Sequence, residues 1–129
     1  MGHVRPFILS KDAKSQADFY AKTLGGVISS VLTHGQTGET RHELQDKVMH
    51  LCLEMEDGSS IFMADSVEPF TQGSGHLLNI SYKAESQARE AFDRLASSGQ
   101  VKVPFAQKPF GLFYGEITDP YGVTWMITA

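Results

Sequence analysis

The sequence predicts an α+β fold built from two βαβββ modules, and three observations lead to this prediction. First, "LEMEDGSSIFMAD" (residues 53–65) and "EITDPYGVTWMITA" (residues 116–129) are two versions of one hairpin, each with a turn glycine before a short apolar strand. Second, a strand pattern and a helical pattern precede each hairpin in the same order. Third, neither half can bury both faces of a sheet alone, which favours two copies that face each other.

The first module covers residues 1–65. In "DAKSQADFYAKTLGG" (residues 12–26) apolar residues recur at helical spacing, and two glycines end the helix. The β-branched stretch "VISSVLTH" is strand-like, and the next six residues form a loop. The expected elements are a strand at 3–11, the helix at 12–26, a strand at 27–34, a loop at 35–40 and a strand pair at 48–55 and 59–65.

The second module covers residues 76–129 and follows a linker at 66–75, which is rich in turn-forming residues. Ala88, Ala91, Phe92 and Leu95 lie on one face of its predicted helix. The expected elements are a strand at 76–83, a helix at 85–99 and strands at 100–107, 111–118 and 123–129. We expect the two modules to form one domain over residues 1–129, since the chain is too short for two large domains.

The composition excludes several classes of protein. Charged residues are 20% of the chain, the net charge is −4 and the basic residues are scattered, so no basic stripe predicts nucleic-acid binding. No apolar run is long enough to span a membrane, and the first residues lack the pattern of a signal peptide. Cys52 is the single cysteine, which excludes an internal disulfide and a cysteine-rich zinc site. These features predict a cytoplasmic protein.

Two longer stretches resemble a known family. "DFYAKTLGG" after an N-terminal strand and "ITDPYGVTWMI" near the end resemble the vicinal oxygen chelate superfamily, which groups glyoxalases, bleomycin-resistance proteins and extradiol dioxygenases. The longer stretches "RPFILSKDAKSQADFYAKTLGG" and "FGLFYGEITDPYGVTWMI" are closest to its PhnB-like branch. The resemblance covers nearly the whole chain and implies a cup-shaped mixed β-sheet with helices outside. It also implies a homodimer, because cups in this superfamily are commonly completed by dimerisation.

The resemblance also implies where a metal would bind. In metal-dependent members four ligands, His and Glu, come from the first and last strands of each module, and open positions on the cation then take the substrate. Counting four residues beyond Gly122 reaches Met126, and the same count from Gly58 reaches Phe62, or Met63 with a shift of one residue. Neither is a carboxylate, and a thioether is a poor ligand for hard divalent cations.

The first-strand positions are equally poor in metal ligands. Counting back from the helix motif places one position near Arg5, with His3 two residues earlier, and the other close to His76, at Leu77 or Leu78. The sequence leaves open whether His3 or His76 faces the cup. We therefore predict no cofactor. A divalent metal is the alternative, and the sequence disfavours it.

Strand alternation predicts which side chains face the cup. On this basis Trp125 packs in the core. The predicted ligand-binding residues are Arg5, Phe7, His50, Glu54, Phe62, Asn79, Tyr114, Glu116 and Met126. A nucleophilic pair of His50 and Cys52 is disfavoured, because residues two apart on a strand are about 7 Å apart. Glu54 and Glu116 are better explained as solvated carboxylates than as an acid and base pair, so no catalytic residue is assigned.

Two functional hypotheses follow from the sequence. The favoured one is a PhnB-like protein that binds a small organic molecule in a metal-free cup, with Arg5 favouring an anionic or carbonyl-bearing ligand. The alternative is a metal-dependent lyase or dioxygenase of the same superfamily with displaced ligands. PhnB-like sequences are often labelled as methyltransferases, but this chain has no glycine-rich loop between a strand and a helix to support methyl transfer.

Overall fold

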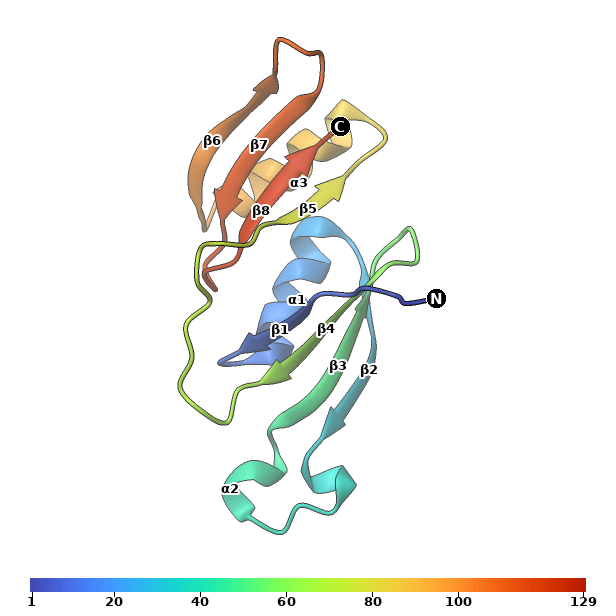
Figure 1. Ribbon diagram of the computed structural model, residues 1–129, viewed down its shortest axis with the longest axis vertical. Coiled ribbons are helices and arrows are strands. Elements are labelled where there is room, and N and C mark those ends of the chain that lie inside the picture. The colour runs from blue at the N-terminus through green and yellow to red at the C-terminus, as the bar shows by residue number, and fades with distance from the viewer. The chain divides into compact units, whose positions relative to one another are not determined.

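A computed structural model describes all residues, 1–129, and confirms the α+β class (Figure 1). The chain divides into two compact units, unit 1 (Met1–Phe70) and unit 2 (Thr71–Ala129), and the boundary lies within the predicted linker. The elements of unit 1 are β1 (Phe7–Ser10), α1 (Ala13–Leu24), β2 (Val27–Thr33), η1 (Gly35–Thr37), α2 (His42–Gln45), β3 (Val48–Glu54) and β4 (Ser60–Asp65). Those of unit 2 are β5 (Leu78–Ser81), α3 (Glu85–Ala96), β6 (Gln100–Gln107), β7 (Phe113–Thr118) and β8 (Thr124–Thr128).

The two sheets have the same topology. The strand order is β1-β4-β3-β2 in unit 1 and β5-β8-β7-β6 in unit 2. In each sheet the first and last strands of the module pair in parallel, and every other pairing is antiparallel. The repeated topology confirms the βαβββ module that the two hairpins predicted.

One long helix covers one face of each sheet (Figure 1). Helix α1 begins after Asp12, whose carboxylate accepts hydrogen bonds from the backbone N–H of Ser15 at 3.1 Å and from its hydroxyl at 2.9 Å. It ends at Gly25, which has a φ of 86° that disfavours any residue with a Cβ. Tyr20 is fully buried on the sheet side of α1, and its hydroxyl accepts a 2.8 Å hydrogen bond from Gln16.

The core of unit 2 forms between α3 and the sheet. Ala88, Ala91, Phe92 and Leu95 are all buried, as their spacing predicted. Gly115 lies opposite Phe92, and a Cβ there would stand 2.8 Å from the Phe92 ring, so only glycine lets the helix approach this strand so closely.

A buried or half-buried aspartate ties each unit together. The Asp65 carboxylate at the end of β4 accepts backbone N–H bonds from Ala13 and Val48, both at 2.7 Å. Because Ala13 begins α1 and Val48 begins β3, one side chain joins three elements. In unit 2, Asp119 has a corresponding structural role in the turn between β7 and β8.

The structure corrects two sequence expectations. The first strand begins at Phe7 and not at His3, so Arg5 lies in the segment that precedes β1. Residues 35–47, a part of which was expected to be loop, include the short helices η1 and α2. These turns are held by local polar contacts and not by an apolar face, so their sequence lacks the periodicity that predicts a helix.

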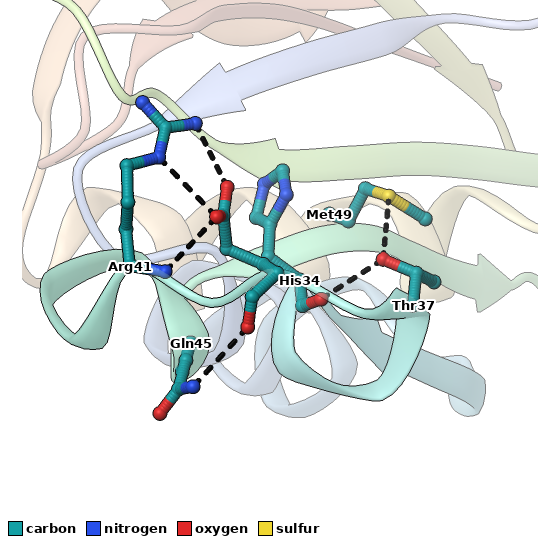
Figure 2. A network of polar contacts seen from close by, with 6 residues as sticks. His34, Thr37, Arg41, Gln45 and Met49 are labelled. Carbon is teal, nitrogen blue, oxygen red and sulfur yellow. Dashed lines mark hydrogen bonds and ion pairs between the residues drawn. The ribbon is translucent and has the colours of Figure 1, made fainter.

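Figure 2 shows the polar contacts within this segment. Arg41 donates two side-chain hydrogen bonds to the Glu39 carboxylate, at 2.8 and 3.2 Å. Gln45 donates to the Glu39 carbonyl oxygen, and the Thr37 hydroxyl contacts both the His34 carbonyl oxygen and the sulfur of Met49.

No helix of the structure is long and apolar enough to cross a membrane.

Candidate ligand-binding faces

The face of the unit 1 sheet opposite α1 carries a cluster of rings. Register pairs Phe7 of β1 with Phe62 of β4, and their ring centroids are 6.4 Å apart. The imidazole of His50, on β3, lies 4.6 Å from the Phe62 ring and 6.0 Å from the Phe7 ring. Phe7 is 52% exposed, so the structure leaves an aromatic surface open on this face. We call Phe7, His50 and Phe62 the aromatic cluster.

Arg5 lies against this cluster although it precedes the strand. Its guanidinium carbon is 5.3 Å from the centre of the Phe62 ring, and its Nη2 is 3.0 Å from Nδ1 of His3. The backbone holds the segment in place, because the Phe62 N–H donates a 3.0 Å hydrogen bond to the Pro6 carbonyl oxygen. The structure thus brings together four of the five predicted residues of unit 1.

Glu54 is the predicted residue of unit 1 that lies outside the cluster. It is exposed at the end of β3, opposite Ser60, and four residues from His50, which is roughly 13 Å along a strand. Cys52 lies between them on the same strand, half-buried and paired by register with Phe62. The Cys52 carbonyl oxygen accepts a 3.4 Å hydrogen bond from the Ser29 hydroxyl, and the His50 imidazole lies against the Phe62 ring.

The corresponding face of unit 2 carries a network of hydrogen bonds. Asn79 of β5 donates through Nδ2 to the Met126 carbonyl oxygen at 3.1 Å and to the Thr128 hydroxyl at 3.2 Å. The Ser81 hydroxyl is 2.7 Å from that of Thr128 and also donates to Oδ1 of Asn79 at 3.3 Å. Asn79 is exposed, so its amide can still reach a ligand.

Tyr114 and Glu116 of β7 form a pair on this face. The Tyr114 hydroxyl donates a short hydrogen bond to Oε2 of Glu116. This bond, with smaller contributions from burial and from the charge of Glu116, raises the pKa of Tyr114 to about 12. The phenol is therefore neutral at physiological pH, and its oxygen keeps lone pairs that can accept a hydrogen bond from a ligand.

Lys108 is a residue that the sequence did not single out. Its ammonium lies 5.9 Å from the centre of the Tyr114 ring. A tight turn returns the chain, because Lys108 N–H donates to the Leu112 carbonyl oxygen and Gly111 N–H donates to that of Lys108. Strand alternation could not have found this lysine, because it lies just beyond the end of β6.

The register makes the two faces comparable position by position. Phe62 pairs with Phe7 and Cys52, and Met126 pairs in the same way with Asn79 and Glu116. Two residues before Cys52 and Glu116 lie His50 and Tyr114. The equivalent positions are therefore Phe7 and Asn79, Phe62 and Met126, Cys52 and Glu116, and His50 and Tyr114. The repeat has diverged into an aromatic face in unit 1 and a hydrogen-bonding face in unit 2.

The same register tests the fit of a metal ion. The paired positions on the first and last strands are Phe7 with Phe62 and Asn79 with Met126. The count from the helix motif had placed the first-strand positions near Arg5 and close to His76, at Leu77 or Leu78. None of the four side chains is an imidazole or a carboxylate, so this set does not suit a divalent cation. Within either unit, no three His, Cys, Asp or Glu side chains are grouped so that they could hold a metal ion.

Unit 1 also has an open recess of about 450 Å³, away from the predicted residues. It is lined by Lys11, Asp12, His42, Glu43, Asp46, Lys47 and Asp65. Both oxygens of Asp65 already accept backbone hydrogen bonds, and the remaining charges are of both signs. The charges that line the recess therefore favour neither an anionic nor a cationic ligand.

The chain belongs to the Glyoxalase/Bleomycin resistance protein/Dioxygenase superfamily, whose family model matches residues 1–127. This agrees with the fold of the two units and with the motifs at both ends of the chain. Among curated proteins, the chain is similar to protein YjdN of Escherichia coli (strain K12), with 22% identity over 121 residues that cover 84% of this chain and 82% of the relative.

Solved structures show the same fold. Protein PA1353 from Pseudomonas aeruginosa matches with a TM-score of 0.84 and 23% identity, over 98% of this chain and 96% of that one. The PhnB protein from Bacillus cereus matches with a TM-score of 0.79 and 23% identity, over 98% of both chains. A glyoxalase/bleomycin resistance protein/dioxygenase domain from Frankia sp. EAN1pec matches with a TM-score of 0.71 and 16% identity, over 99% of this chain and 90% of that one.

Proposed function

We propose that this protein binds a small organic molecule on the helix-free faces of its sheets, without a metal ion. The observation that carries the proposal is the pair of equivalent sites on the parallel strands. Phe7 and Phe62 occupy one and Asn79 and Met126 the other, and none of these four side chains is an imidazole or a carboxylate.

Each face offers its own means of recognition. Ligand sites combine an apolar wall, which contributes buried area, with a few polar groups that fix orientation. The aromatic cluster of unit 1 supplies such a wall. Asn79, Tyr114 and Glu116 supply donors and acceptors in unit 2. The proposal makes no use of Glu54, which lies outside the aromatic cluster.

Neither of the other activities gains support from these residues. A lyase or dioxygenase would need a cation held by donors other than the four on the paired strands. For methyl transfer, the connection from β1 to α1 would be expected to hold a glycine-rich loop, and it consists of Lys11 and Asp12.

Two measurements test the proposal. Elemental analysis of the purified protein should find no divalent metal at stoichiometric level. A thermal-shift screen of small organic molecules should find ligands, since a ligand at 100 times its Kd stabilises the folded state by about 2.7 kcal/mol. Phe62→Ala should abolish the shifts caused by ligands of the unit 1 face, and Asn79→Ala those caused by ligands of the unit 2 face. Val27→Ala, a change at a 67% exposed position at the start of β2, should keep both.

A stoichiometric metal, or ligands whose binding survives both Phe62→Ala and Asn79→Ala, would contradict the proposal.

A further inference from the structure

We propose that the ligand is a planar aromatic carboxylate, with its ring against the aromatic cluster and its carboxylate paired with Arg5. This inference rests on the proposed function and names the class of molecule that the unit 1 face takes. It uses contacts within unit 1 alone.

The first argument is the charge state of Arg5. The other three arginines each have a carboxylate within 3.4 Å, in the pairs Arg41 with Glu39, Arg89 with Glu85 and Arg94 with Glu90. Arg5 has instead an aromatic ring and an imidazole as its neighbours. It is exposed, and it brings to this face a positive charge that no carboxylate of unit 1 neutralises.

The second argument is the number of N–H donors that Arg5 can still offer. Its contact with the Phe62 ring, 5.3 Å from the guanidinium carbon to the ring centre, is a cation–π contact and uses no N–H group as a hydrogen-bond donor. One nitrogen of Arg5 contacts His3, and a guanidinium has five N–H donors in all. The remaining donors can form the paired, parallel hydrogen bonds that a carboxylate accepts from arginine.

The third argument is the aromatic surface beside that charge. Phe7 is half exposed and meets the Phe62 ring edge-on, so the two rings present a face and an edge side by side. Leu9, the next residue on the same face of β1, is 44% exposed. Large apolar side chains that remain open in this way favour a ligand that covers them with a flat apolar body.

The fourth argument is the absence of negative charge in the cluster. By register the neighbours of His50 and Cys52 on β2 are Leu32 and Ser30, which are uncharged. A carboxylate beside Arg5 would therefore meet a cation and no carboxylate. A cationic ligand would meet the Arg5 charge instead, which opposes its binding.

The experiment uses full-length protein with any tag at the C-terminus, because Arg5 is close to the N-terminus. Binding of 2-naphthoate, neutral 2-naphthamide and cationic 2-naphthylmethylammonium is measured by titration calorimetry. We expect 2-naphthoate to bind most tightly, and Arg5→Ala to weaken it roughly 10- to 100-fold, as for loss of a charge-assisted hydrogen-bonded pair. Arg5→Lys should recover only part of this loss, because lysine lacks the planar fork.

The control is Arg41→Ala, which removes an arginine that already has a carboxylate partner in the segment between β2 and β3. It should leave the affinity for 2-naphthoate unchanged. Phe62→Ala should lower the affinity for every probe that binds the parent protein, because it removes the ring that contacts both Arg5 and the ligand.

Three results would overturn the inference. They are equal affinity for the acid and the amide, an unchanged affinity in Arg5→Ala, and tighter binding of the cation. In each case the proposed function is still supported if the thermal-shift screen finds ligands whose shifts are lost in Phe62→Ala or in Asn79→Ala. If no naphthyl compound binds, the inference is wrong, and the screen alone then decides the proposed function.

Discussion

The indole Nε1 of Trp125 donates a buried 2.9 Å hydrogen bond to Oδ2 of Asp119. The other oxygen of Asp119 accepts the backbone N–H groups of Tyr121, at 2.8 Å, and of Val123, at 3.1 Å. The aspartate of the "DPYG" turn therefore fixes the turn and joins it to the largest side chain of the unit 2 core. Trp125 is 2% exposed, which places it in the core as the sequence predicted.

Loss of this aspartate should destabilise the protein without touching the helix-free faces. Asp119→Ala leaves three donors without their acceptor and should lower the free energy of unfolding by about 2–4 kcal/mol. Trp125→Ala should cost about 3–5 kcal/mol, since it removes a buried ring. Urea denaturation measures both. Asp93→Ala, at an exposed position of α3, is the matched control and should stay within about 0.5 kcal/mol of the parent protein. A value for Asp119→Ala as small as this would show that the hydrogen bonds contribute little.

The Tyr114 and Glu116 pair should be visible in a pH titration. One of the four tyrosines should ionise with a pKa of about 12, and Glu116→Gln should lower that value towards 10. The folded-state pKa lies above the unfolded value, so the pair's contribution to stability is full below pH 10 and is lost as pH rises through about 12. Phenolate absorbance measures the ionisation, and Tyr114→Phe identifies the residue. An unchanged titration in Glu116→Gln would contradict the assigned cause.

The segment between β2 and β3 contains a carboxylate, Glu39, whose pKa is lowered, whereas the pKa of Tyr114 is raised. Hydrogen bonds from the Arg41 side chain and then from its backbone N–H lower the pKa of Glu39 to about 2. The contribution of this pair is full above the unfolded value of 4.5 and is lost as pH falls through about 2. Arg41→Gln should return the Glu39 pKa towards 4.5, as NMR titration measures, while Arg94→Gln should leave it unchanged. A Glu39 pKa near 4.5 in the parent protein would refute the contact.

Met126→Glu should not create a tight metal site. The new carboxylate would stand beside Glu116, its register partner, and opposite Asn79, so like charges would meet with no imidazole in place. Like charges opposite each other on strands cost roughly 0.2–1 kcal/mol, and we expect a lower Tm. Calorimetric titration with Zn²⁺ and Mn²⁺ measures binding. Tight binding by this single variant would show that other ligands were already in position, and the metal-free proposal would then fail.

We expect the protein to be a homodimer. The edge strand β2 consists of seven residues without charge or proline, whereas the other long edge strand, β6, carries Lys102 and Pro104, which protect an edge from pairing. Light scattering after size-exclusion chromatography should give twice the 14.2 kDa chain mass. Ser29→Lys in β2 should favour the monomer, and Gln100→Lys in β6 should not. A monomer for the parent protein at micromolar concentration would contradict this expectation.

The sequence predicted the sheet face of most candidate residues, because strand alternation is local. Phe7, Phe62 and His50 meet on the face that period-two alternation assigned to them, and so do Asn79, Tyr114, Glu116 and Met126. Arg5 was included for a different reason, since the count back from the helix motif reached it, and it precedes a strand that in fact begins at Phe7. Glu54 satisfies the alternation but lies beyond the rings, since alternation fixes the face of a residue and not its distance from the others.

By itself the sequence determined the α+β class, the two βαβββ modules and the buried face of each long helix, because all of these follow from periodicity within short segments. The register of strands distant in the chain is a property of the folded sheet, so only the tertiary structure decided that Phe7 lies opposite Phe62 and Asn79 opposite Met126. It also placed Arg5 over Phe62 and Lys108 over Tyr114. Arg5 and Lys108 both lie in segments just outside a strand. No repeating pattern constrains a side chain there, so only its neighbours in space fix its position.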